Sequence, residues 1–282
     1  MSDPSTMFDR IDSLLGRLRT TTSDAHPIFA RITETAVRYY AASWIRAATL
    51  KNSVRYDAPP DPMRRYDVDP HSVERTVSWT HISANRKAGE QPRFRQPVYK
   101  LAGRVTGGEW DLTADRFADS TVYESFEAHF VDGVPWVETA FYEETLAAIE
   151  DGAQPWDCNS RSDLRNRCAF LDDLYAQLES TGYLTQEELH EAGDPTTSSV
   201  RLYRTLWGEI AVNVGRNGEL IFQDGRNRLG IARLLGLETV PVVILVRHAE
   251  WQRTRDRVAR GEVTRSSLSD ELREHPDLRP LL

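Results

Sequence analysis

Cysteine is scarce in this sequence. Only Cys158 and Cys168 occur in 282 residues. Two thiols cannot build the disulfide framework of a small secreted scaffold, and no second pair offers the spacing of a structural zinc site. Unpaired cysteines of this kind are typical of a reducing compartment. We therefore expect two reduced thiols, no metal site and a cytoplasmic location.

Long hydrophobic runs are also missing. The most apolar stretch, residues 27–50, is interrupted by Arg31, Glu34, Arg38 and Arg46, and a helix that crosses a bilayer needs about 20 predominantly apolar residues. The N-terminus shows no basic segment followed by an apolar core, so no signal peptide is expected. We expect no membrane span. A helix on a membrane surface remains an alternative for this stretch, and a helix docked on the protein body is favoured.

Lysine is also rare in this sequence. The basic residues number 35 and only three of them are lysine (Lys51, Lys87 and Lys100), which leaves 32 arginines. The formal net charge of -8 argues against attraction of nucleic acid over the whole surface. An acidic chain that prefers arginine is compatible with a halophilic source or with GC-rich codon usage.

The remaining composition is that of a globular protein. Hydrophobic residues make up 40% of the chain, which is enough to bury a core. The pattern of elements predicts an α+β fold, with helical N-terminal and middle regions around a small mixed β-sheet core. The expected organisation is a helical segment (1–56), an extended proline-rich linker or arm (57–96), a strand followed by a helical region (97–197), the core (198–262) and a polar, peripheral tail (263–282).

Hydrophobic periodicity and turn residues predict the individual elements. Ser160 or Ser162 is a candidate cap for the longest helix of the middle region, and Gly182 ends it. Asn217-Gly218 predicts a hairpin turn. The expected helices are 7–50, 124–130, 136–149, 160–178, 226–235 and 248–260, and the expected strands are 77–82, 97–105, 210–214, 220–223 and 240–246.

One motif points directly at chemistry. An apolar strand ends at Asp224-Gly225, and a helix begins at once with Arg226 and Arg228 in its first turn. Free N–H groups, the positive end of the helix dipole and two guanidinium groups together favour an anion such as phosphate. Gly225 allows close approach of a ligand, and Asn227 can donate from its amide. The alternative is an ordinary helix cap at Asp224 with solvated arginines.

The surrounding pattern resembles the ParB/sulfiredoxin-like fold. A hairpin, Asp-Gly-x-x-Arg, an amphipathic helix, Leu-Gly-Leu and a Val-Pro-Val strand follow one another over about residues 200–250. Members of this fold bind CTP or ATP, or phosphorylate free serine. The resemblance implies that Gly225, Arg226, Asn227 and Arg228 hold nucleotide phosphates. It also implies ATP, ADP or CTP as the nucleotide, and Mg²⁺ as its metal.

Two positions depart from that family pattern. The catalytic cysteine of sulfiredoxins falls at Arg226, so reduction of a sulfinic acid is not expected. The histidine of other members falls at Asn227, which can bind phosphate but cannot shuttle a proton. A phosphotransferase also needs a carboxylate near the substrate hydroxyl, and the candidates are Asp224, Glu109 and Asp111. An ordinary turn around a packed tryptophan is the favoured alternative for Glu109 and Asp111.

Three functions are compatible with these residues. The leading interpretation is a nucleotide- or phosphate-binding protein that transfers phosphate to a small hydroxylated substrate. The second is a non-enzymatic regulator that uses the same pocket to sense a ligand. The third is nucleic-acid binding through Arg253, Arg255, Arg257 and Arg260 on one helix edge, although neighbouring carboxylates favour an ordinary solvated helix there.

Overall fold

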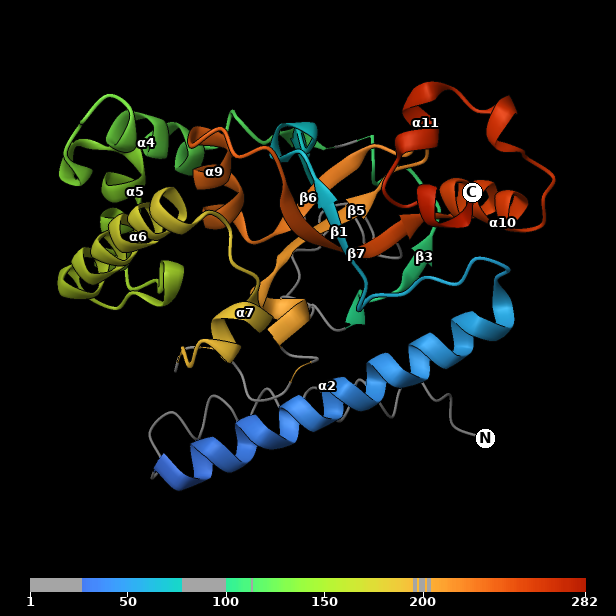
Figure 1. The fold of residues 1–282 in the computed structure, drawn as a ribbon. Helices are drawn as coiled ribbons and strands as arrows, with labels where there is room; N and C mark the ends of the chain where they lie inside the picture. Colours follow the sequence, from blue (N-terminus) through green and yellow to red (C-terminus); the bar gives the residue numbers. More distant parts are fainter. Residues whose placement is uncertain (1–26, 78–99, 113, 195–196, 198–200, 202–203) are drawn as a thin grey trace.

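One mixed β-sheet organises the protein (Figure 1). The computed structural model of the chain describes residues 27–77, 100–112, 114–194, 197, 201 and 204–282. Within them the strand order is β1-β7-β5-β6-β2-β4, and β3 also pairs with β7. The strands are β1 (Arg65–Val68), β2 (Arg75–Thr76), β3 (Arg104–Thr106), β4 (Asp115–Arg116), β5 (Ile210–Val214), β6 (Leu220–Asp224) and β7 (Val240–His248).

Helices surround this sheet and confirm the predicted α+β class. The α-helices are α2 (Pro27–Arg55), α4 (Thr121–Phe130), α5 (Ala140–Glu150), α6 (Arg161–Thr181), α7 (Gln186–Glu191), α9 (Arg226–Leu234), α10 (Ala249–Ala259) and α11 (Asp270–Glu274). A π-helical turn, η5 (Arg204–Gly208), precedes β5. Single 3₁₀ turns are η1 (Pro70–Ser72), η3 (Trp136–Glu138), η4 (Pro155–Asp157), η6 (Arg265–Ser267) and η7 (Arg279–Leu281).

The centre of the sheet confirms the predicted hairpin. Strands β5 and β6 are antiparallel, and Gly218 in the turn between them has φ +94, which a glycine adopts without strain. Helix α9 then connects β6 to β7, which returns parallel to β5. Gly236 follows this helix with φ +64, as its predicted position after the helix end requires.

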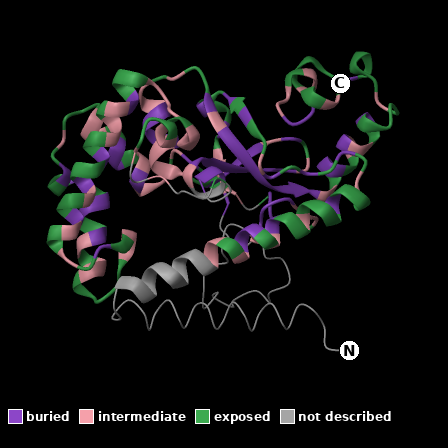
Figure 2. Cartoon of the chain, turned by 60° about the horizontal axis from the view of Figure 1, so that its bottom comes forward, coloured by how far each residue is buried: buried purple, intermediate pink, exposed green. Residues whose placement is uncertain are grey.

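The two faces of the sheet alternate along the central strands, as the period of two in a β-strand dictates. Val212 of β5 and Phe222 of β6 face one core, which also takes in Leu229 of α9. Ala211 and Ile221 face the opposite core, where α2 packs. The central strands β5, β6 and β7 are almost wholly buried between these layers, whereas the outer faces of the helices are exposed (Figure 2).

The helical middle region forms a third core around α4, α5 and α6. The predicted cap of α6 is confirmed, because the hydroxyl of Ser160 accepts the N–H of Asp163 at 3.1 Å. Gly182 ends the same helix with φ +72. Ile231 joins this core from the outer side of α9. Helix α9 is therefore packed between the sheet and the helical region.

The N-terminal half differs from the expectations in its boundaries. Helix α2 extends to Arg55 and docks on the sheet through Ala41 and Ile45, as favoured over a membrane surface. The predicted strand 97–105 is reduced to β3, which begins only at Arg104. Residues 7–26, 78–82 and 97–99 of the predicted elements lie outside the described residues. Across the described part of the chain, no helix combines the length and apolar character needed to cross a membrane.

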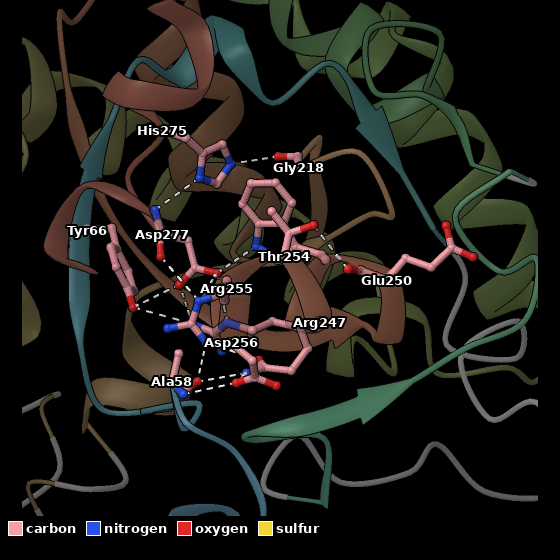
Figure 3. A network of polar contacts seen from close by, with 12 residues as sticks. Ala58, Tyr66, Gly218, Arg247, Glu250, Thr254, Arg255, Asp256, His275 and Asp277 are labelled. Atoms are coloured by element: carbon pink, nitrogen blue, oxygen red, sulfur yellow. Dashed lines mark hydrogen bonds and ion pairs between the residues drawn. The ribbon is translucent and has the colours of Figure 1, made fainter. Parts of the chain in front are cut away.

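The C-terminal tail corrects the expectation that it is peripheral. Asp277 and Leu278 are buried, and the Asp277 carboxylate accepts hydrogen bonds from Arg247 at 2.7 and 2.9 Å (Figure 3). Trp251 donates its indole N–H to the same carboxylate at 2.9 Å, and Tyr66 donates its hydroxyl at 3.2 Å. This network joins the tail to α10, β7 and β1.

Candidate functional site

The β6–α9 turn, residues 224–228, depends on a glycine. Asp224 is exposed at the end of β6, and its Oδ1 accepts the N–H of Gly225 at 2.8 Å. Gly225 has φ +88, and a Cβ there would lie 2.9 Å from Cα of Ile210. This close approach explains the glycine by packing of the turn against β5. It also leaves the turn without a side chain that would cover the helix start.

The backbone amides of Asn227 and Arg228, in the first turn of α9, are candidate donors to a ligand. No side chain caps this helix, and the first N–H of its ladder belongs to Leu229, which donates to Gly225 O at 3.1 Å. The N–H groups of Asn227 and Arg228 have no acceptor among the described residues. Such amides point along the helix axis at its positive end and are a ready site for an anion.

The two arginines of the turn have different surroundings. The guanidinium of Arg226 lies over the ring of Phe222, 5.8 Å from its centroid, so part of this side chain covers the core. Arg228 is half-buried and acts electrostatically on Tyr183 and Glu209. Arg228 is therefore the cation of the turn that is held beside a buried carboxylate.

Sequence reasoning missed that carboxylate, Glu209. Its side chain is only 1% exposed, and burial raises its pKa above the ordinary value although hydrogen bonds and two arginines oppose the shift. The carboxylate accepts the N–H of Gln186 at 2.9 Å and the hydroxyl of Tyr183 at 3.2 Å, and a guanidinium N of Arg65 lies 3.7 Å away. A buried carboxyl with a raised pKa is a candidate functional group.

The backbone of Glu209 packs directly against the β6–α9 turn. A Cβ on Gly225 would lie 3.5 Å from the carbonyl oxygen of Glu209, so the start of β5 runs under the start of α9. The only sequence signal is a charged residue between Gly208 and the apolar strand that begins at Ile210. That position does not reveal burial, because burial is produced by the docking of α7, whose first N–H the carboxylate accepts.

Asp111 and Glu109 lie at the opposite end of β6 from Asp224. The Asp111 carboxylate accepts hydrogen bonds from the side chain of Arg216 at 2.8 and 2.9 Å and from its backbone N–H at 2.9 Å, and Arg216 belongs to the hairpin turn. Because five residues of β6 separate that turn from the β6–α9 turn, the two ends are about 13 Å apart. Thus the structure does not bring Asp111 to Asp224.

The local environment of Asp111 indicates a structural role. Burial alone would raise its pKa, but the hydrogen bonds from Arg216 outweigh this effect and lower it. Glu109 is exposed beside it, and Trp110 is buried between them, as the alternative interpretation of this turn expected. His248 donates from Nε2 to the Gly108 carbonyl at 3.1 Å and caps α10 through Nδ1. These contacts hold the loop of residues 107–112 against the sheet.

The remaining candidates do not form a second site. Over the described ranges, no group of three or more His, Cys, Asp or Glu side chains could hold a metal ion. Arg255 is buried and donates to backbone and side-chain acceptors. The other arginines on α10 and at its end pair with carboxylates: Arg253 with Glu250, Arg257 with Glu262, and Arg260 with Asp57 and Glu262. The predicted basic edge for nucleic acid is therefore largely neutralised.

Comparison with known proteins adds no assignment. Neither protein-family models, nor curated proteins, nor solved structures match this chain. The site must accordingly be interpreted from its own geometry.

Proposed function

We propose that this protein binds the phosphate groups of a nucleotide or another small phosphate-bearing molecule at the β6–α9 turn. The observation that carries the proposal is the uncapped start of α9, where the N–H groups of Asn227 and Arg228 have no acceptor within the described part of the chain. The resemblance of this segment to the ParB/sulfiredoxin-like fold supports the same position, since phosphate-binding residues of that fold fall on Gly225 to Arg228.

The arrangement divides the work of binding among its residues. The helix-start amides of α9 and the Asn227 amide supply directional donors, and Arg228 supplies the positive charge. Glu209 beneath the turn attracts the guanidinium groups of both Arg228 and Arg65. A phosphate bound here replaces the water that the exposed amides would otherwise bind.

Transfer of the bound phosphate is the further part of the proposal. Asp224 is exposed next to the helix start, where its carboxylate can accept the proton of a substrate hydroxyl or bind Mg²⁺ together with the phosphates. The second candidate function is a ligand sensor, which uses the same amides and Arg228 but carries out no reaction. The absence of a side-chain cap favours binding in both cases equally.

The test of binding is a calorimetric titration of the full chain with ATP, ADP and CTP in the presence and absence of Mg²⁺. We expect saturable binding by the unmodified protein and a loss of at least tenfold in affinity for Arg228→Ala. Arg165→Ala is the matched control, because Arg165 is exposed on α6 and lies outside the turn. Equal affinities in the two variants would contradict the proposed site.

A second measurement separates an enzyme from a sensor. Phosphate release or transfer that is present in the unmodified protein and lost in Asp224→Asn, with nucleotide affinity retained, supports phosphotransfer. Saturable binding with no turnover on any hydroxylated acceptor tested favours the sensor. Turnover that persists in Asp224→Asn rules out the role proposed for Asp224.

A further inference from the structure

A separate cationic cavity lies under α2. Its volume is about 480 Å³, and residues of α2, β1, α7 and η5 line it. This volume lies within the range of natural small-molecule sites, roughly 300–1,000 Å³. Three arginines reach it from different parts of the chain: Arg46 of α2, Arg65 of β1 and Arg201. None of the residues of the β6–α9 turn is among its described lining.

The carboxylates near this cavity already have cations. Glu187 lines the wall, and its two oxygens accept hydrogen bonds from one guanidinium N of Arg204, each at 3.0 Å. The hydrogen bond from Arg204 lowers the pKa of Glu187 and so stabilises its charged form. Glu209 lies 3.7 Å from a guanidinium N of Arg65 and is also attracted by the charge of Arg228. The negative charges of Glu187 and Glu209 are therefore largely compensated by arginines of the protein itself.

Two of the lining arginines form no ion pair with a carboxylate of the described residues, although the charge of Arg201 helps to lower the pKa of Glu187. Over the described residues, neither Arg46 nor Arg201 has a carboxylate oxygen within 4.0 Å. Both are exposed toward solvent, which keeps their charges hydrated in the ligand-free protein. An accumulation of positive charge is notable in a chain whose formal net charge is -8. This cavity is thus a positively charged region on a protein whose net charge is negative.

The rest of the lining suits a small organic anion rather than a bare ion. Ser43 and Thr205 place hydroxyl groups at the wall, where each donates to a backbone carbonyl of its own segment, at 3.0 and 3.2 Å. Their oxygen atoms can therefore accept a hydrogen bond from an O–H or N–H group on the carbon skeleton of an organic ligand, whereas the anionic groups must be bound by the arginines. Tyr39, Ala42 and Met63 supply apolar surface. Guanidinium groups recognise carboxylate and phosphate with paired N–H donors.

We propose that this cavity binds a small molecule with two or more anionic groups, carboxylate or phosphate. One anionic group lies between Arg46 and Arg201, a second interacts with Arg65, and the carbon skeleton lies against Tyr39 and Met63. This binding does not depend on the function proposed for the β6–α9 turn. Among the described residues, two links join the cavity to that turn: Arg65 contacts Glu209, and α7, which carries the lining residue Glu187, donates its first N–H to the same carboxylate.

The experiment titrates the full chain with citrate and with pyrophosphate by calorimetry at low and high salt. Citrate tests a polycarboxylate and pyrophosphate tests a phosphate-bearing ligand. We expect saturable binding of at least one of them, with a loss of tenfold or more in both Arg46→Ala and Arg201→Ala. Arg46→Lys retains the charge without the paired donors and should bind with intermediate affinity.

Two control variants make the outcome specific. Lys51→Ala removes an exposed positive charge from the same helix outside the cavity, and it should leave the affinity unchanged. Arg228→Ala removes the cation of the β6–α9 turn and should also leave it unchanged. Circular dichroism confirms that each variant is folded.

The inference is overturned if neither anion binds saturably, or if Arg46→Ala loses no more affinity than Lys51→Ala. Loss of binding in Arg228→Ala with full binding in Arg46→Ala also overturns it, because the anion then occupies the turn. That last result supports the proposed function while it removes the cavity site, so the two proposals fail separately.

Discussion

Replacing Asp277 by asparagine should strongly destabilise the protein. The Asp277 side chain is 0% exposed, as is that of Arg247, and the neutral amide would leave Arg247 and Arg255 buried without an anion. Burial opposes ionisation of Asp277, but the attraction and hydrogen bonds of these arginines lower its pKa to about 2 from 3.8. This lowering of the pKa corresponds to roughly 2 kcal/mol of linkage.

That figure is a lower bound for the substitution. Breaking a buried ion pair by removing one partner costs about 3–5 kcal/mol, because the remaining charge stays desolvated. We therefore expect Asp277→Asn to lose about 3 kcal/mol or more of the free energy of unfolding at pH 7. Urea denaturation followed by tryptophan fluorescence measures it, and Trp251, which donates to Asp277, reports on the site itself.

The pH dependence gives an independent check. The pKa of Asp277 is lower in the folded than in the unfolded protein, so its stabilisation is fully present above about pH 4 and is lost as the pH falls toward about 2. The variant should lack this part of the acid dependence. Asp270→Asn is the control, since the Asp270 side chain is 96% exposed. A loss below about 1 kcal/mol in Asp277→Asn would refute the reasoning, as buried pairs are expected to cost more.

Three further substitutions test the turns. Gly225→Ala should cost about 3 kcal/mol, because its φ of +88 is unfavourable for alanine and its Cβ would meet the Ile210 backbone at 2.9 Å. Gly236→Ala, with φ +64 and no atom within 4 Å, should cost only about 1 kcal/mol; equal losses would contradict the clash. Arg216→Ala leaves the buried Asp111 without its cation and should lower the midpoint of urea denaturation, whereas an unchanged midpoint would show that Asp111 is solvated.

The local parts of the fold could be predicted from the sequence. The β5–β6 hairpin follows from two short apolar runs on either side of Asn217-Gly218, and the start of α6 follows from Ser160. Gly236 marks the end of α9, because glycine is the residue most often found just after the end of a helix. Each of these signals acts over a few residues, so no knowledge of the rest of the chain is needed.

The non-local parts could not be predicted. Strands β2 and β4 contain two residues each, which is too short for a periodic pattern. Strand β1 does alternate, with Tyr66 and Val68 buried, but the prolines before it indicated a linker. The sequence places Asp277 in a polar tail, because its partner Arg247 lies 30 residues earlier and no local pattern connects the two. The candidate site likewise has a local part, which the sequence predicts, and a non-local part, which it does not.

The β6–α9 turn can be recognised in the sequence, because residues 224–228 are five consecutive polar or glycine residues. The structure explains the glycine by its close packing against β5. Glu209 and the cavity arginines were not visible. Their significance depends on which charges are already neutralised, and this is decided by contacts such as Arg204 with Glu187. Single charged residues far apart in a sequence carry no such information.

The strand order also determines when the sheet can form during synthesis. Strands β1 and β3 pair with β7, and β2 pairs with β6, yet all three are translated long before their partners. From Val68 to Ile210 the ribosome needs roughly 7–28 s at about 5–20 residues per second. Throughout that interval the edges of the early strands have no central strand to pair with. The nascent chain must therefore keep about 200 residues from aggregating until the segment from β5 to β7 emerges and gathers the earlier strands around it.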